Sequence, residues 1–320
     1  MADTDRELLL RTVTRTQGAN AALKDGGVEP KGFRFDFEEV PVLVQGFRRM
    51  VRGLEFDVSE MALTTYLVAK AHGVRFTALP VFLVRGFHHG AIRYDPRSSE
   101  VRGPADLAGR RVGVNRGYTV TTGVWARSVL AEEHGVDLDG ITWVCSGDEH
   151  VEAYRPPANV VSEPGADLVE RVLSGELAAV VGAGADDPRL APLIPDPEEA
   201  GLAALRSRGH YPINHLVVVR DELLEREPWL APEIFDTFAR AKRCYVERLR
   251  AGAIESPSRS DRLLRRVMEA TGGRDPLPYG VELNRAVLAE LQRHAVAQHI
   301  LDRPLPLTEL FAAGTLDLSA

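Results

Sequence analysis

The stretch VGVNRGYTVTTGVWARSVL, residues 112–130, contains the local pattern that decides the fold. It begins as a short apolar strand, passes through a polar turn rich in hydroxyl groups, and continues as a helix over residues 122–133. The first backbone N–H groups of such a helix have no partner within it, so together with the hydroxyls they can bind a carboxylate. The predicted anion contacts are Tyr118, Thr119, Thr121 and Thr122, with Arg116 as an additional charge-assisted donor. In the alternative that stays open, one threonine caps the helix and the others face solvent.

The same alternation of strands and helices continues along the 320 residues, which is typical of an α/β protein with a mostly parallel sheet. Turn-forming residues at 95–104 mark a boundary between two lobes. The apolar strand INHLVVVR at 213–220 is followed by an almost wholly helical tail, which would most simply return to the first lobe. We therefore predict a discontinuous first lobe, 1–107 and 212–320, and a second lobe, 108–211, joined by a two-strand hinge. A cleft between two lobes is a favoured place for a ligand.

Composition narrows the class of partner. The chain has only two cysteines, which disfavours a disulfide framework, and its net charge of −7 disfavours a broad nucleic-acid surface. Nowhere do 18 apolar residues run together, so no membrane span is expected. The first residues lack the basic region and the longer apolar stretch of a secretory signal, so we expect a cytoplasmic location. A small-molecule carboxylate is the expected partner.

No cofactor and no metal are expected from motifs. The sequence has no HExxH pair, no paired CxxC and no dinucleotide or phosphate-loop fingerprint, and two adjacent histidines cannot specify a metal on their own. The histidines at 72, 134, 294 and 299 lie in helical contexts and are assigned no role. The C-terminal helices have enough apolar surface to pack on the first lobe or on another subunit, so a homo-oligomer stays open.

Five phrases of the sequence together resemble the 4,5-dihydroxyphthalate decarboxylase family. They are FDVSEMALTTYLVAKAHG (56–73), GPADLAGRRVGV (103–114), GYTVTTGVWARSVLAEEHGVD (117–137), GELAAVVGA (175–183) and PINHLVVVRDELLEREPWLAPEIF (212–235). The resemblance runs from Phe35 to Leu316. It implies the type II periplasmic-binding-protein fold, in which two lobes close around a ligand. Members and near relatives of that family are decarboxylases or substrate-binding proteins of transporters.

The resemblance also implies site residues. In the family, the stretch that corresponds to residues 84–90 usually has the form Arg-x-Phe-Arg-His-Ser, which Arg85, Phe87 and His89 match and from which Gly90 departs. His88 departs from that form, because an imidazole replaces a guanidinium that could clamp a carboxylate. His215 matches a family histidine, whereas Gln17 begins a phrase where the family commonly has Tyr-Asp-Arg, so an anion contact of the family is absent here. Alternatively, His88 and His89 only form hydrogen bonds with the loop backbone and do not contact a substrate.

Two further positions complete the candidate site. Ser59 and Glu60 precede a helix that we expect at 61–72, where Ser59 could bind an anion or a phenol and Glu60 could act as a base or orient a histidine. Alternatively, Glu60 is only an acidic residue near a helix N-terminus. His150 follows a strand of the second lobe, and ligands bind at the carboxyl ends of parallel strands.

These residues favour a decarboxylase that needs no cofactor. In a hydroxylated aromatic acid such as 4,5-dihydroxyphthalate, deprotonation of the phenol by Glu60 or a histidine would increase the electron density at the ring carbon that bears the carboxylate. His89 or His215 would then protonate that carbon, and carbon dioxide would leave. The alternative is a solute-binding protein of an ABC-type transporter that closes on a small organic anion without chemistry. An enzyme that acts on a nonaromatic acid stays open as a third reading.

Overall fold

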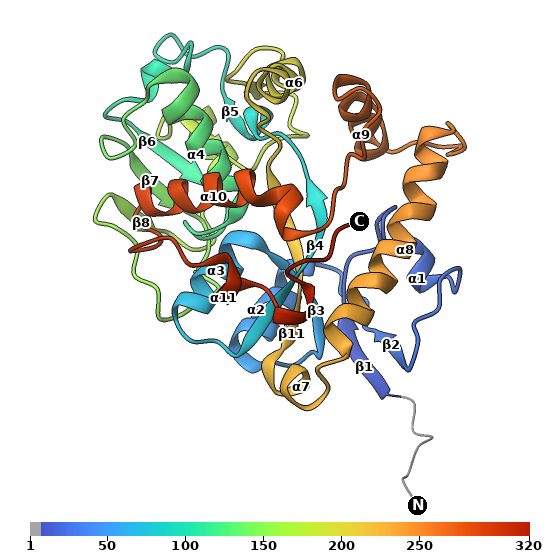
Figure 1. The fold of residues 1–320 in the computed structure, drawn as a ribbon. Coiled ribbons are helices and arrows are strands. Elements are labelled where there is room, and N and C mark those ends of the chain that lie inside the picture. Colours follow the sequence, from blue (N-terminus) through green and yellow to red (C-terminus); the bar gives the residue numbers. More distant parts are fainter. Residues whose placement is uncertain (1–7) are drawn as a thin grey trace, which may run out of the picture. The chain divides into compact units, whose positions relative to one another are not determined.

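The computed structural model describes residues 8–320, which form two compact units (Figure 1). The first unit comprises the described residues up to Arg85 together with His215–Ala286 and Leu305–Ala320. The second comprises Gly86–Asn214 and Val287–Pro304. Each unit contains a sheet of its own with helices, which confirms the prediction of two α/β lobes.

The sheet of the first unit has five strands in the order β2-β1-β3-β11-β4. β1 runs parallel to both of its neighbours, whereas β11, which comes much later in the chain, runs antiparallel to β3. All residues of the central strand β3 are buried, so a polar side chain there needs partners inside the protein. The bounds are Leu8–Val13 (β1), Phe33–Phe37 (β2), Val58–Ala62 (β3), Phe76–Arg85 (β4) and Ile213–Arg220 (β11).

The longest helix of the first unit, α8, is amphipathic. Its buried residues Ile234, Phe238, Ala241, Tyr245 and Leu249 recur every three or four positions, which places them on one face of the helix. α10 begins in the first unit and ends in the second. The bounds are Ala21–Lys24 (α1), Leu43–Gly53 (α2), Leu63–Ala71 (α3), Asp221–Arg226 (α7), Leu230–Arg250 (α8), Arg259–Ala270 (α9), Val281–Ala297 (α10), Leu307–Leu310 (α11) and Ala313–Thr315 (the 3-10 helix η3).

The sheet of the second unit has six strands in the order β10-β5-β9-β6-β7-β8. Because β5 pairs with β9 and β10, the segment 86–107 belongs to this unit, whereas we had placed it in the first lobe. The bounds are Ile92–Tyr94 (β5), Arg111–Val114 (β6), Thr142–Cys145 (β7), Val160–Ser162 (β8), Ala179–Val181 (β9), Ala191–Pro192 (β10), Thr121–His134 (α4), Leu168–Leu173 (α5), Pro197–Arg208 (α6), His89–Ala91 (the 3-10 helix η1) and Pro104–Leu107 (the 3-10 helix η2).

The strand–turn–helix pattern predicted at residues 112–130 is confirmed, as β6 followed by α4. Most of α4 is buried, because both of its faces carry apolar residues such as Val124, Trp125 and Leu130. The helix ends at Gly135, whose positive φ of 64° lets its N–H donate to the carbonyl of Ala131.

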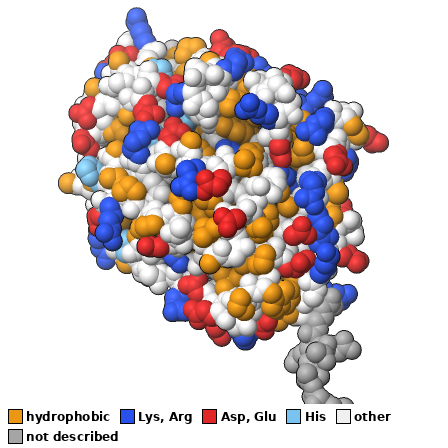
Figure 2. Space-filling view, in the orientation of Figure 1, with side chains coloured by type: hydrophobic (Ala, Val, Ile, Leu, Met, Phe, Trp, Pro, Cys, Tyr) orange, Lys and Arg blue, Asp and Glu red, His pale blue; other side chains and the backbone are white. Residues whose placement is uncertain are grey.

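The charged side chains are mixed rather than segregated on the face of the molecule drawn in Figure 2. Blue Lys and Arg side chains alternate there with red Asp and Glu side chains, so this face presents no broad basic surface for a nucleic acid. Within residues 8–320, none of the helices combines the length and the apolar character needed to cross a bilayer.

Candidate functional site

A buried carboxylate and an imidazole meet on two neighbouring strands of the first unit. Glu60 lies on β3 and His215 on β11, and the register pairs Glu60 with Val217 and His215 with Ala62. Glu60 and His215 are thus diagonal neighbours on one face of the sheet, within reach of long side chains. Oε1 of Glu60 lies 2.6 Å from Nδ1 of His215. The sequence predicted both residues, and the fold brings them together.

Further donors hold the Glu60 carboxylate. The backbone N–H of Arg15 donates to Oε2 at 2.9 Å, and Nε2 of Gln17 donates to Oε1 at 3.3 Å. Glu60 is fully buried, and a buried carboxylate is stabilised only by such partners. The ring of His215 packs edge-on against Phe47, with 5.2 Å between centroids.

The second nitrogen of His215 is available for chemistry. Nδ1 is held by Glu60, and no described residue forms a hydrogen bond with Nε2. The side chain of His215 is 18% exposed, whereas that of Glu60 is not exposed at all. His215 can therefore present Nε2 to a bound molecule, while Glu60 can act only through His215.

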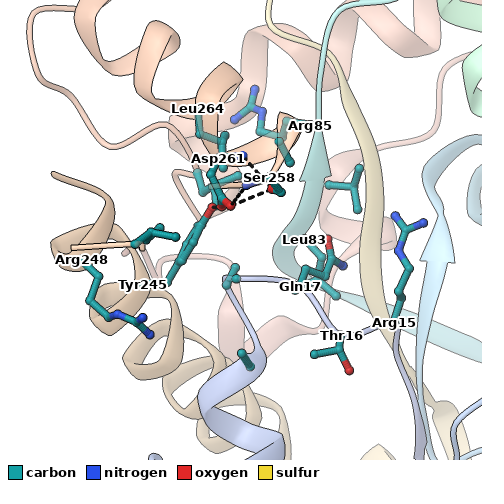
Figure 3. Close-up of a pocket in the computed structure, with 17 residues that line it drawn as sticks. Arg15, Thr16, Gln17, Leu83, Arg85, Tyr245, Arg248, Ser258, Asp261 and Leu264 are labelled. Carbon is teal, nitrogen blue, oxygen red and sulfur yellow. Dashed lines mark hydrogen bonds between the residues drawn. The ribbon is translucent and has the colours of Figure 1, made fainter. Parts of the chain in front are cut away.

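A cavity of about 550 Å³ lies in the first unit (Figure 3), and neither Glu60 nor His215 is among the residues that line it. Gln17 lines the cavity and also touches Glu60, so it connects the two. Three arginines line it as well. Arg15 follows β1, Arg85 is the last residue of β4, and Arg248 lies on α8. Such a volume is ample for a small aromatic acid.

Two of the three arginines of the cavity carry a charge that no described carboxylate pairs with. Among the described residues, Arg15 and Arg248 form no ion pair, and Nη1 of Arg85 donates to the amide oxygen of Asn284 at 2.8 Å. The carboxylate in the wall, that of Asp261, accepts hydrogen bonds from Tyr245 and from the Ser258 backbone and hydroxyl. The cavity can therefore bind an anion.

A glycine permits the close packing of this wall. A Cβ at Gly18 would lie 2.1 Å from the ring of Tyr245, so a larger residue would push the ring aside. Figure 3 shows Tyr245 directed toward Asp261, which caps α9 together with Ser258. Arg15, which lines the same cavity, was not predicted from the sequence. Its position two residues after β1 was the available signal.

Ser59 does not lie where the sequence analysis placed it. We expected a helix from residue 61, but β3 extends through Ala62 and α3 begins at Leu63. Ser59 is therefore a buried strand residue, remote from free helical N–H groups, and its hydroxyl donates to the carbonyl of Glu60 at 2.7 Å.

The polar turn before α4 holds a carboxylate from the chain itself. The backbone N–H groups of Tyr118 and Thr119 and the hydroxyl of Thr119 all donate to Glu149. A Cβ at Gly117 would lie 2.7 Å from Oε2 of Glu149, so glycine allows this close approach. Two of the residues predicted to bind a substrate carboxylate, Tyr118 and Thr119, thus bind the carboxylate of Glu149, which the sequence did not reveal.

The other predicted substrate contacts of the second unit, in and near this turn, differ in their burial. Arg116 has a left-handed φ of 71°, and its N–H donates to the Ser146 hydroxyl at 3.0 Å. Thr121 and His150 are buried, and Thr122 is half-buried at the start of α4. Their contact with a substrate stays a prediction.

A fully buried arginine holds the turn before α4 in place. Arg127 on α4 donates to the carbonyl of Tyr118 at 2.7 Å and to the amide oxygen of Gln298 at 2.7 Å. Its guanidinium lies 3.9 Å from the centroid of the Tyr118 ring. Burial raises the pKa of Tyr118, so its hydroxyl is neutral near pH 7.

Four histidines of the second unit form what we call the histidine cluster. The rings of His88, His210 and His294 pack against Trp125, and that of His89 packs against His210. All four are buried. His89 and His210 pair with acidic residues, as Nε2 of His89 lies 2.9 Å from Glu133 and Nδ1 of His210 lies 2.9 Å from Glu290. The cluster is therefore part of a hydrogen-bonded network of imidazoles and carboxylates.

The network keeps Glu133 ionised. Burial by itself would raise the pKa of this carboxyl, but hydrogen bonds from His89 and Arg208 lower it to about 2. Glu133 lies near the end of α4, twelve residues after Thr121, which corresponds to about 18 Å along a helix. His89 thus lies at the opposite end of α4 from the Thr119 turn. Within the second unit, the fold does not bring these two predicted site residues together.

His88 is expected to make stability depend on pH. Burial and the neighbouring His210 and His89 lower the pKa of His88 from 6.5 to about 3. Below about pH 6.5 the unfolded chain binds a proton there that the folded protein binds only near pH 3, so the free energy of unfolding falls with pH in this window. In His88→Gln, that slope is expected to decrease by up to about 1.4 kcal/mol per pH unit between about pH 6 and 4.

Urea unfolding at steps between pH 7 and pH 4 measures this slope. His299→Gln provides the matched control, because the His299 side chain is 57% exposed. Equal slopes in the wild type and in His88→Gln would show that His88 is not held neutral by burial.

Solved structures similar to this chain have the type II periplasmic-binding-protein fold. The desulfurization enzyme DSZB is 17% identical with a TM-score of 0.56, and 96% of each chain is covered. The periplasmic aliphatic sulphonate binding protein SsuA from Escherichia coli is 11% identical with a TM-score of 0.53, covering 98% of this chain and 100% of that one. At such identities the likeness establishes the fold alone.

Two relatives of known name are more similar in sequence, although no protein-family model matches the chain. A 4,5-dihydroxyphthalate decarboxylase from Comamonas testosteroni is 32% identical over 311 residues, which is 91% of either chain. A protein of the same name from Pseudomonas putida is 34% identical over 189 residues, 54% of this chain and 70% of that one. The chain therefore belongs to the 4,5-dihydroxyphthalate decarboxylase family.

Proposed function

We propose that this protein is a decarboxylase of a hydroxylated aromatic diacid, with 4,5-dihydroxyphthalate as its substrate and no cofactor. The observation that carries the proposal is the identity of 32% across 91% of a decarboxylase of that name. The paired Glu60 and His215 and a cavity with three arginines support it, because a diacid needs cationic partners and its decarboxylation needs a proton donor. We include a cytoplasmic location in this proposal.

The arginines of the cavity bind the carboxylates of the substrate. A guanidinium matches a carboxylate in charge and geometry, and Arg15 and Arg85 line the same cavity as Gln17, which touches Glu60. In this proposal, the ring fixed in this way presents one of its carbons to Nε2 of His215, which lowers the entropy cost of the encounter.

His215 supplies the proton for the reaction. The hydroxyl group para to the departing carboxylate increases the electron density at the ring carbon that bears this group. Nε2 of the protonated His215 donates its proton to that carbon, the bond to the carboxylate breaks, and its electron pair restores the aromatic ring. The dianion and one proton thus yield carbon dioxide and 3,4-dihydroxybenzoate, and His215 regains a proton from solvent.

Glu60 acts on His215 rather than on the substrate. Its carboxylate is fully buried and receives three hydrogen bonds, from His215, Gln17 and the Arg15 backbone, so it cannot reach a phenol. It orients the imidazole and stabilises its protonated form, as a carboxylate does in other catalytic pairs. His89 is left out of this mechanism because it is fully buried and pairs with Glu133.

A panel of aromatic acids tests the proposed function. Purified protein is incubated with 4,5-dihydroxyphthalate, with phthalate, which lacks the para hydroxyl, and with 3,4-dihydroxybenzoate, which lacks the second carboxylate. Carbon dioxide release and product mass are measured. We expect turnover of the first compound, none of phthalate, and at most slow turnover of the third. Saturable binding without product across the panel would instead indicate a solute-binding protein.

Arg15→Gln is expected to raise KM for the diacid about 10- to 100-fold, since a hydrogen bond to a charged group contributes roughly 1.5–3 kcal/mol. Steady-state kinetics of carbon dioxide release measure the change. Arg303→Gln is the control, because Arg303 is an exposed arginine outside the cavity. An unchanged KM in both Arg15→Gln and Arg85→Gln would show that the diacid binds elsewhere.

A further inference from the structure

Two glutamates and a histidine converge in the second unit, away from Glu60 and His215. Glu290 and His294 lie one turn apart on α10, and Glu132 comes from α4. Nε2 of His294 lies 3.5 Å from Oε2 of Glu132 and 3.9 Å from Oε1 of Glu290. One donor atom from each of the three residues lies within 4.8 Å of the others. No role is expected for His294 from the sequence, although Glu290 stands four residues before it, at ligand spacing.

The imidazole of His294 points into this cluster without a hydrogen-bond partner. Its side chain is only 5% exposed, and Nε2 is buried with no acceptor or donor in hydrogen-bonding geometry among the described residues. A buried polar atom that faces two carboxylates in this way is costly unless a cation or a proton joins them. This unsatisfied nitrogen distinguishes the cluster from an ordinary group of surface acids.

We propose that Glu132, Glu290 and His294 bind a divalent transition-metal ion, with Zn²⁺ as the best fit. Imidazole nitrogen and carboxylate oxygen are ligands that Zn²⁺ prefers, at distances of about 2.0–2.2 Å. Ligand atoms at tetrahedral angles around such an ion are about 3.4 Å apart. The two distances from Nε2 of His294 are 3.5 and 3.9 Å, and the carboxylate oxygens lie within 4.8 Å of each other. A water molecule would complete the coordination, and the ion would link α4 to α10.

Arginines now share these carboxylates and compete with a metal ion. Nη1 of Arg208 lies 3.0 Å from Oε1 of Glu290 and 3.8 Å from Oε2 of Glu132, and Arg293 pairs with Oε1 of Glu132. Arg208 also pairs with Glu133 through Nη2, so it keeps a carboxylate partner when Glu290 turns to a metal ion. His210 also lies 2.9 Å from Oε1 of Glu290, through Nδ1.

Zinc titration of the chelator-treated full chain tests the site. Calorimetry is expected to show one Zn²⁺ bound per chain, with a rise in Tm. His294→Gln and Glu132→Gln are each expected to weaken binding at least about 100-fold, while the exposed control His299→Gln leaves it unchanged. Arg208→Gln is expected to strengthen binding about tenfold, because the competing cation is gone.

Two results would overturn this assignment. One is the absence of saturable Zn²⁺ binding, and the other is binding that is unchanged in both His294→Gln and Glu132→Gln. Circular dichroism verifies that each variant is folded. Glu132→Gln is the variant least expected to disturb folding, because the Glu132 side chain is 30% exposed.

Discussion

Replacement of His215 by glutamine is expected to lower kcat for carbon dioxide release about 1000-fold and to change binding of the diacid by only a few-fold. Glutamine keeps a polar side chain of similar length beside Glu60, but it cannot donate a proton to carbon as an imidazolium does. A positioned proton donor typically contributes about 10²- to 10⁴-fold. The rate of carbon dioxide release at saturating diacid gives kcat, product mass identifies the product, and calorimetry gives Kd for the diacid.

His72→Gln is the matched control for this substitution. His72 lies in the same unit, at the end of α3, and is exposed. It should retain wild-type activity. If His215→Gln kept more than about a tenth of the wild-type kcat, another group would have to supply the proton.

Glu60→Gln is expected to lower kcat about 100- to 1000-fold. The amide cannot stabilise the imidazolium of His215, and it can leave the ring in the wrong tautomer. The buried amide also faces donors that previously met a carboxylate, so we expect a loss of about 1–3 kcal/mol in the free energy of unfolding. Kinetics and urea unfolding of the same preparation separate the two effects.

Rescue by the conservative variant distinguishes a positioning role of Glu60 from a merely structural one. Glu60→Asp keeps the charge that faces Nδ1 of His215 and should restore part of the kcat that Glu60→Gln loses, with KM for the diacid changed little in either variant. The positioning role would be contradicted by equal kcat of the Gln and Asp variants at equal stability, or by a loss of activity that lies in KM alone.

Local patterns in the sequence predict local structure well in this protein. The strand–turn–helix at residues 112–130 follows from a change of hydrophobic period around a polar turn, and β11 follows from its apolar run. The start of α3 was wrongly predicted by two residues, because the tertiary environment extends β3 through Ala62. Such boundaries depend on pairing with strands that are distant in the sequence, so a short stretch of sequence cannot predict them.

Partners far apart in the chain could not be predicted from local pattern. The carboxylate of Glu149 binds the turn at Thr119, which lies thirty residues earlier in the chain. Arg15 and Arg248 line the same cavity, although they are 233 residues apart. His89 had a family match but no visible partner, and the fold pairs it with Glu133 at the far end of α4. Only the topology of the sheets brings such residues together or separates them.

The most direct measurement follows 4,5-dihydroxyphthalate incubated with stoichiometric wild-type protein and with His215→Gln. The wild type is expected to convert all of the diacid to 3,4-dihydroxybenzoate and one equivalent of carbon dioxide, whereas His215→Gln binds the diacid and leaves it intact. Quantitative recovery of unchanged diacid from the saturated wild-type protein would contradict the account and would indicate a protein that only binds its ligand.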